Sequence, residues 1–280
     1  MLQSRNYAPS PHLALYIARH YVSRAPLPPA FTMIDRLLAE TAFIRILITG
    51  DWAAETAPGQ WERPGDVLFF GANARPFKVR VRGPFFIVGI ALRPSGWRAL
   101  SGHPASDFAD RMVRLADVWN EDAEAQLATV AKLTDDDAIV SICEEAITAQ
   151  LKMSASGRVN AAMQHLETVA RLDSATRVED LAEQLGISSR QLERLSTAHF
   201  GHTPKTVMRR SRFLDMAAAM RGLGDPDDEY LAALRYFDQS HRTREFKHFI
   251  GMTPAEFERT PTPLLDAGIQ LRQDRKHHTY

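Results

Sequence analysis

Two kinds of hydrophobic pattern divide the chain near residue 152. The first half contains short apolar runs separated by Gly, Pro, Asn and Asp, which predict strands at Phe43–Ile48, Asp66–Phe70, Phe77–Arg82 and Phe85–Leu92. Within Phe77–Arg82 the apolar residues alternate with three cations, Lys78, Arg80 and Arg82. We therefore expect a small sheet with one face in a core. The cationic face is either an ordinary solvated surface or one that attracts an acidic ligand or a partner.

A helical pattern follows, from Trp97 to Leu151. Apolar residues recur every 3.6 positions after the acidic run Asp135–Asp137, which is suited to cap a helix. These helices could pack on the sheet or on a second subunit. The polar run Lys152–Gly157 ends this part and predicts a linker.

The region after the linker has the pattern of short helices joined by a tight turn. Thr176 is a plausible N-cap for a helix whose apolar stripe runs from Val178 to Leu185, and Gly186 ends it. Ser188 caps the next helix, with Gln191 completing a capping box, and Thr203 and Pro204 begin a third. The first two helices form either a helix-turn-helix or an ordinary helical hairpin.

This unit occurs twice. Gly201-His-Thr-Pro204 recurs fifty residues later as Gly251-Met-Thr-Pro254. A fixed offset between such segments indicates a duplicated supersecondary unit, which favours the helix-turn-helix over the hairpin. Between the copies, an uninterrupted helical pattern runs from Pro204 to about Arg221 and would span roughly 27 Å. Because major grooves on one face of DNA repeat about every 34 Å, both units could contact one duplex.

Positive charge is concentrated in the first copy. Between Ser188 and Arg212 the net charge is +5, with Glu193 the only acidic residue against Arg190, Arg194, Lys205, Arg209, Arg210 and Arg212. DNA binding requires such a patch to neutralise phosphates, although a solvated basic face has the same composition. The whole chain is neutral, with a pI of about 7.2, because acidic clusters at Asp135–Asp137 and 225–229 balance the basic helix.

These residues resemble the DNA-binding region of the AraC/XylS transcription regulators over about residues 158–259. The resemblance rests on the following segments: Leu181-Ala-Glu-Gln-Leu-Gly-Ile-Ser188, Arg190, Leu192 and Arg194, Asp238-Gln-Ser-His241, Arg244-Glu-Phe-Lys247 and Gly251-Met-Thr-Pro254. It implies two helix-turn-helix subdomains joined by a long helix, with their recognition helices in successive major grooves. It also implies a β-rich effector-binding or dimerising domain ahead of them, and the segment Gly89–His103 resembles the N-terminal module of one such subgroup.

The positions of the inward residues Leu192, Leu195 and His199 identify the outward face of each recognition helix. The candidate DNA-contacting residues are Ser189, Arg190, Glu193, Arg194 and Thr197 in the first copy, and Gln239, Ser240, Thr243, Arg244 and Lys247 in the second. Arginine can bind guanine through two hydrogen bonds, glutamine can bind adenine, and Lys247 is better placed for phosphate. For each of them, a merely solvated side chain is the alternative.

Three departures from the family pattern distinguish the two copies. Ser196 occupies the position of an aromatic core residue, which the second copy retains as Phe246. Arg235 replaces a turn glycine, and Arg242 stands where the first copy has Leu192. We therefore expect the first recognition helix to read DNA more reliably than the second.

Other functions find little support in the sequence. Cys143 is the only cysteine, which excludes an intramolecular disulfide and suits a reducing compartment. His12, His20 and His103 are too scattered for a cupin metal site, and no nucleophile elbow, P-loop or dinucleotide motif occurs. Cys143 on an apolar stripe favours a buried structural thiol. Four tryptophans, Trp52, Trp61, Trp97 and Trp119, are either packing residues or part of a ligand pocket.

The sequence thus predicts an α+β protein. A small β-rich, cupin-like or related domain with packed helices occupies residues 1–152, followed by a linker at 153–157, an all-α domain of two helix-turn-helix subdomains at 158–260 and a flexible tail at 261–280. The predicted function is non-enzymatic, sequence-specific regulation of transcription in the cytoplasm. The expected partners are double-stranded DNA, a small-molecule effector, a second copy of the chain and RNA polymerase, with no cofactor, metal or membrane. The alternative is a ligand-binding or interaction module whose C-terminal helices bind protein.

Overall fold

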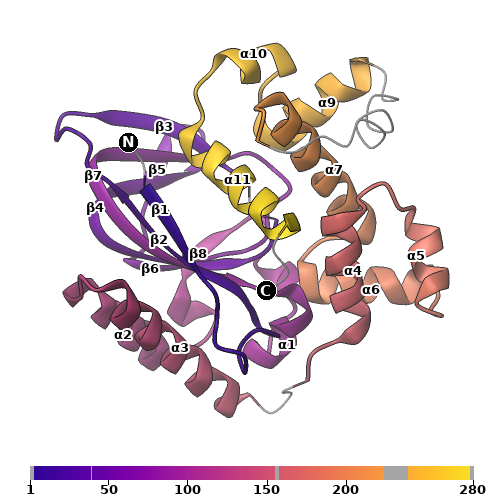
Figure 1. The fold of residues 1–280 in the computed structure, drawn as a ribbon, viewed down its shortest axis with the longest axis horizontal. Helices are drawn as coiled ribbons and strands as arrows, with labels where there is room; N and C mark the ends of the chain where they lie inside the picture. Colours follow the sequence, from indigo (N-terminus) through magenta and orange to yellow (C-terminus); the bar gives the residue numbers. More distant parts are fainter. Residues whose placement is uncertain (1–2, 39, 155–157, 224–238, 278–280) are drawn as a thin grey trace.

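The structure is a computed structural model that describes residues 3–38, 40–154, 158–223 and 239–277. In these ranges the chain forms a β-rich part followed by a helical part (Figure 1). The chain is therefore of the α+β class, as the sequence predicts.

One antiparallel sheet contains all eight described strands, in the order β1-β2-β7-β4-β6-β8, with β3 paired to β7 and β5 to β4. The strands are β1 (Gln3–Tyr7), β2 (Ile17–Ala25), β3 (Thr32–Leu37), β4 (Phe43–Ala57), β5 (Gln60–Glu62), β6 (Val67–Phe70), β7 (Phe77–Leu92) and β8 (Met112–Arg114).

The two runs predicted at Phe77–Arg82 and Phe85–Leu92 are one continuous strand, β7. Gly83 between them has φ +63°, and the register of β7 against β4 shifts near this point. A glycine in a strand often marks such an irregularity, because it adopts positive φ at little cost. The chain therefore bends at Gly83 without leaving the sheet, and β7 pairs with β2, β3 and β4.

The sheet has apolar residues on both faces. On one face, Ile44, Ile46 and Val88 belong to a core that also contains Ile139 and Cys143 of α3. The helices of this part are α1 (Trp97–Leu100), α2 (Glu121–Ala128) and α3 (Asp136–Met153), with short 3-10 turns at Pro94–Gly96, Ala105–Asp107, Leu115–Asp117 and Thr129–Lys132. Asp135 caps α3 by accepting a hydrogen bond from the Ala138 amide, as the acidic run predicts.

The opposite face of the sheet is covered from the far end of the chain. A second core contains Phe43, Leu47, Val79 and Phe85, and Leu264 packs against it. Leu264 lies in α11 (Pro263–His277), which crosses this face between β3 and α7 (Figure 1). The expectation of a flexible tail is wrong for residues 263–277, because Leu265 and Ile269 are buried in the core of the helical part.

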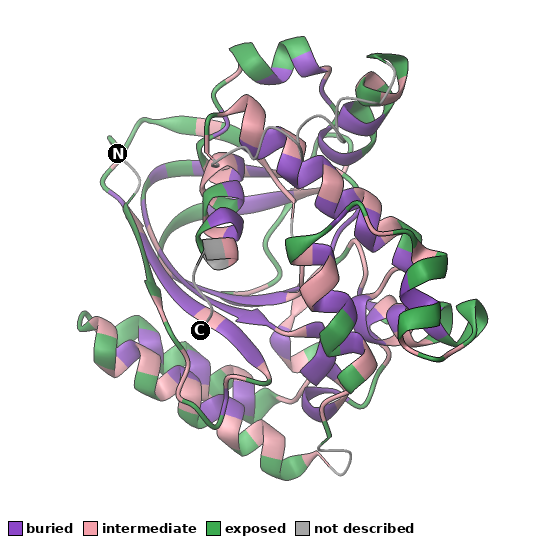
Figure 2. Cartoon of the chain, turned by 45° about the vertical axis from the view of Figure 1, so that its right-hand side comes forward, coloured by how far each residue is buried: buried purple, intermediate pink, exposed green. Residues whose placement is uncertain are grey.

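The fifty-residue repeat of the sequence appears in the helical part as two sets of equivalent helices. Its helices are α4 (Ala161–Leu172), α5 (Val178–Gln184), α6 (Ser189–Phe200), α7 (Pro204–Met220), α9 (Gln239–Ile250) and α10 (Pro254–Arg259). The bounds of α9 are those of α6 displaced by fifty residues. Figure 2 shows that buried residues line the strands and the inward sides of these helices.

The two copies end and restart in the same way. Gly201 and Gly251 leave α6 and α9 with φ of +77° and +67°, and Thr203 and Thr253 cap α7 and α10 ahead of a proline. Ser188 and Gln191 form the predicted capping box. The predicted cap at Thr176 is wrong, since α5 begins at Val178 with Arg177 as its N-cap. Thr176 donates to Asp173 instead, at 2.6 Å.

Candidate nucleic-acid interface

The polar face of α6 is open to solvent. Leu192 and Ser196 are buried on the inner side of the helix, whereas Ser189, Arg190, Glu193 and Arg194 are exposed and Thr197 is half-buried. Within the described residues, Arg190 and Arg194 form no salt bridge or hydrogen bond. Their guanidinium groups are therefore available to an external acceptor such as a guanine edge or a phosphate.

The second recognition helix presents a similar face. In α9, Gln239, Ser240, Arg244 and Lys247 are exposed and Thr243 is half-buried, donating to the Gln239 carbonyl at 3.0 Å. Each copy thus presents the polar positions predicted for base and phosphate contact. The turn position Arg235 lies outside the described residues, so its effect on the second copy stays a prediction.

The core position that differs between the copies is filled in two ways. Phe246 is fully buried, with its ring centroid 5.0 Å from that of Phe213 and 5.5 Å from that of Phe257. Ser196 is also fully buried and donates to the His202 carbonyl at 2.7 Å. The first copy thus replaces an aromatic contact with a hydrogen bond to the turn that follows α6.

Arg242 does not enter the core at the position equivalent to Leu192. It is exposed and lines a cavity of about 360 Å³ between α7 and α9, together with Lys205, Arg209 and Arg212. The Arg209 guanidinium is paired with Glu245 at 2.6 Å. The lining of this cavity holds four cations and one carboxylate, that of Glu245, and this positive balance suits a phosphate of a bound DNA strand.

The predicted basic patch is smaller than its sequence suggests. Arg210 is fully buried and donates to the backbone carbonyls of Asn73, at 3.0 Å, and of Glu40. Arg212 donates to the Ser174 carbonyl at 2.9 Å. Arg210 therefore binds the β-rich part, because a guanidinium with five donors can satisfy carbonyls at a domain boundary as well as phosphates.

The end of α6 also docks on the β-rich part. His199 Nδ1 lies 3.0 Å from the Pro94 carbonyl oxygen, and His202 Nε2 lies 2.9 Å from that of Ala72. Burial lowers the pKa of both imidazoles, and the positive charge of Arg210 lowers that of His202 further. Both are therefore neutral near pH 7 and each donates a ring N–H to its carbonyl.

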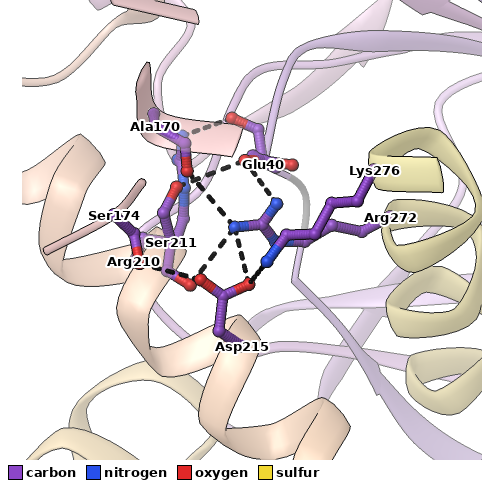
Figure 3. Close-up of polar contacts among 8 residues, drawn as sticks. All are labelled: Glu40, Ala170, Ser174, Arg210, Ser211, Asp215, Arg272 and Lys276. Atoms are coloured by element: carbon purple, nitrogen blue, oxygen red, sulfur yellow. Dashed lines mark hydrogen bonds and ion pairs between the residues drawn. The ribbon is translucent and has the colours of Figure 1, made fainter. Parts of the chain in front are cut away.

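A buried charge cluster joins three parts of the chain (Figure 3). Asp215 of α7 accepts from Arg272 at 2.9 Å and from Lys276, both in α11, and from the Ser174 hydroxyl at 2.7 Å. Arg272 also lies 3.5 Å from Glu40, in the segment between β3 and β4. The linking helix of the helix-turn-helix pair is thus held to the sheet domain through α11.

The local patterns of the sequence do not predict this contact between the two parts. They predict His199 as a core position, Arg210 as part of the basic patch, and residues 261–280, which include Arg272 and Lys276, as a flexible tail. The spacing of apolar residues in the C-terminal segment is a signal for a packed helix there, since Leu265 and Ile269 are four residues apart and precede Arg272.

The other expectations for the β-rich part have mixed outcomes. On β7, Lys78 pairs with Glu55 at 2.7 Å and Arg82 lies 3.8 Å from Asp51, while Arg80 lies over the ring of Trp61. Neighbouring carboxylates therefore offset two of the three cations of this face. Trp52 and Trp97 are buried packing residues. Cys143 is buried, and burial raises the pKa of its thiol to about 12. No described helix combines the length and apolar character needed to cross a bilayer.

Two protein families match separate parts of the chain. Residues 181–260 match a family described as a helix-turn-helix domain, and residues 5–114 match a domain of unknown function, DUF6597. No curated protein matches the chain.

Solved structures that align with this chain include ToxT from Vibrio cholerae, with 11% identity and a TM-score of 0.47 over 92% of this chain and 97% of that one. The structure of ToxT bound to an unsaturated fatty acid is 12% identical in sequence, with a TM-score of 0.47 over 88% of this chain and 97% of that one. The AraC-like transcriptional activator CuxR is 14% identical in sequence, with a TM-score of 0.26 over 77% of this chain and 86% of that one. The family match and the two equivalent units together make residues 181–260 a helix-turn-helix domain.

Proposed function

We propose that this protein is a sequence-specific DNA-binding regulator of transcription whose β-rich domain senses a small molecule. The observation that carries the proposal is the pair of equivalent helix-turn-helix units, with α6 and α9 displaced by fifty residues and both polar faces exposed. A helical hairpin that binds a protein does not need a second equivalent unit. Binding to two successive major grooves of DNA uses two such units, held apart by one long helix.

In this proposal α6 supplies most of the base recognition. Arg190 and Arg194 bind guanine edges, and Lys205 and Lys247 bind phosphates. The contacts of His199, His202 and Arg210 with the β-rich part restrict where α6 and α7 can move. A ligand that binds one arrangement of the two parts better than another would therefore change the affinity for DNA.

The test is selection of bound sequences from a random DNA pool, followed by gel shifts on the selected site. Arg190→Ala and Arg194→Ala should each weaken binding by about 1–3 kcal/mol and relax base preference at one position. Lys247→Ala should weaken binding to all sequences. It should also reduce by about 1 the slope of the logarithm of the binding constant against the logarithm of the salt concentration. Arg177→Ala is the matched control, because Arg177 is an exposed arginine at the start of α5, outside α6.

The rival function, protein binding by the same helices, predicts other results. Selection would then return no common sequence, and any DNA binding would be equal in the wild type and in the Arg190 and Arg194 variants. Steep weakening with salt together with a selected site supports the regulator.

A further inference from the structure

A partly open cavity of about 130 Å³ lies between the sheet and α11. Its walls come from β2, β4 and β7, and its roof from Leu264, Gly268 and Leu271 of α11. The lining is mostly apolar. A cavity of this size can hold about one aromatic ring, since engineered apolar cavities of about 150 Å³ bind benzene.

A buried cation stands in the wall of this cavity. Arg45 lies in β4, on the same sheet face as Phe43 and Leu47, and its relative exposure is 9%. Within the described residues, the Arg45 guanidinium meets no carboxylate and makes no hydrogen bond. Buried charges in proteins are normally paired, so this one requires an explanation.

Aromatic rings surround the guanidinium where a counter-ion would otherwise be expected. The guanidinium carbon lies 5.1 Å from the ring centroid of Phe43, 5.3 Å from that of Phe70 and 5.5 Å from that of Trp52. These contacts favour a cation but accept none of its N–H donors. The cage therefore holds Arg45 in position and leaves its hydrogen-bonding capacity to an occupant of the cavity.

The neighbouring strands place Tyr21 beside Arg45. Tyr21 of β2, Gly89 of β7 and Arg45 of β4 are directly paired across the three strands. A Cβ atom at Gly89 would lie 1.9 Å from Cζ of Tyr21, so only glycine lets the tyrosine ring lie across this row. The Tyr21 hydroxyl makes no hydrogen bond among the described residues. The row thus places a hydroxyl and a guanidinium on one wall.

We propose that this cavity binds a small organic carboxylate with an apolar body of about one ring, whose carboxylate pairs with Arg45. An anion supplies the missing charge and can accept two parallel N–H bonds from the guanidinium. A neutral ligand would leave the charge unpaired. Arg19 and Arg272 also line the cavity, against one carboxylate, Glu40, which lies 3.5 Å from Arg272, so the lining favours an anion over a cation. The inference rests on the proposed function only in taking the β-rich domain as the sensing part.

The roof connects this site to the DNA-binding part. Leu264, Gly268 and Leu271 cover the cavity, while Arg272 and Lys276 of the same helix bind Asp215 of α7. An occupant that shifts α11 therefore changes the contact that holds the linking helix.

The experiment is calorimetric titration of the full chain, without DNA, with benzoate, benzamide, benzylamine and inorganic phosphate. Benzoate should bind and raise Tm, and the other three probes should bind at least ten-fold more weakly. Arg45→Met should weaken benzoate binding at least ten-fold. Arg80→Met is the matched control and should bind like the wild type, since Arg80 also stacks on a tryptophan of the same sheet, 5.1 Å from the ring of Trp61, but does not line the cavity.

The variant should fold, because an apolar residue of similar length removes an unpaired buried charge. If Arg45→Met unfolds, Arg45→Lys serves instead: it keeps the charge, loses the bidentate geometry and should bind benzoate at least three-fold more weakly. Equal benzoate binding by the folded Arg45 variant, a preference for benzamide, or no binding of benzoate and its methylated or short branched analogues would overturn the proposal. Because no DNA is present, a failed gel shift would count against the proposed function alone.

Discussion

The Arg272 guanidinium of α11 lies 2.9 Å from the Asp215 carboxylate of α7, and both side chains are almost fully buried, at 4% and 3% exposure. Removing Arg272 leaves Asp215 with Lys276 as a remaining cation, so the cost is below the about 3–5 kcal/mol of a lone buried pair. We expect Arg272→Met to lower the free energy of unfolding by about 1–3 kcal/mol, measured by urea denaturation.

Gln270→Ala on the exposed side of the same helix is the control and should change stability by less than about 0.5 kcal/mol. A loss below about 1 kcal/mol for Arg272→Met would show that α11 does not hold α7 through this pair.

Substitutions at the core position that differs between the copies, Ser196 in the first and Phe246 in the second, should destabilise the protein. Phe246→Ala removes a buried ring and should cost about 3–5 kcal/mol. Ser196→Phe should also destabilise, by about 1–3 kcal/mol, because it overfills a closed site and leaves the His202 carbonyl without its donor. Thermal unfolding measures both changes.

Arg242→Leu, which installs the first copy's residue, is the matching control and should leave the stability within about 0.5 kcal/mol, because Arg242 is exposed. A stable Ser196→Phe variant would mean that the first copy has room for the aromatic residue it lacks.

Acid should weaken the contact between the two parts. The pKa values of His199 and His202 are lowered by burial, so the folded protein binds these protons less tightly than the unfolded chain. Their contribution to stability is therefore fully present above the unfolded pKa, about 6.5, and is lost as the pH falls from there through the lowered folded pKa values. Each imidazole adds a slope of up to about 1.4 kcal/mol per pH unit below that point.

Urea denaturation at several pH values between 5 and 7.5 tests this dependence. His202→Gln can still donate to the Ala72 carbonyl and does not titrate, so its stability should fall less steeply with acid than that of the wild type. An unchanged slope would mean that His202 does not titrate on unfolding in this range.

Cys143 should be inert in the folded protein. Burial raises the pKa of its thiol to about 12, so the thiolate that reacts with disulfide reagents is scarce at pH 8. We expect no reaction with a disulfide reagent under native conditions and one equivalent in urea. Rapid native labelling, faster than unfolding, would contradict the buried position of this residue.

The local elements of the helical part can be predicted from short stretches of sequence. The fifty-residue offset, the Ser188 and Gln191 capping box and the exits at Gly201 and Gly251 all appear in the structure. Caps, turns and periodicity are set by residues within one or two helical turns, so they can be read from short segments. The exposed positions Arg190 and Arg194 followed from the same periodicity.

How distant segments meet depends on the packing of the whole chain. It joined two predicted runs into β7, buried Arg210 against the sheet domain, and placed α11 over the cavity that contains Arg45. A long cationic side chain has the same sequence pattern whether its partner is water, a phosphate, a carbonyl or a carboxylate. Its role depends on which backbone lies beside it, and that is settled by packing between segments far apart in the chain.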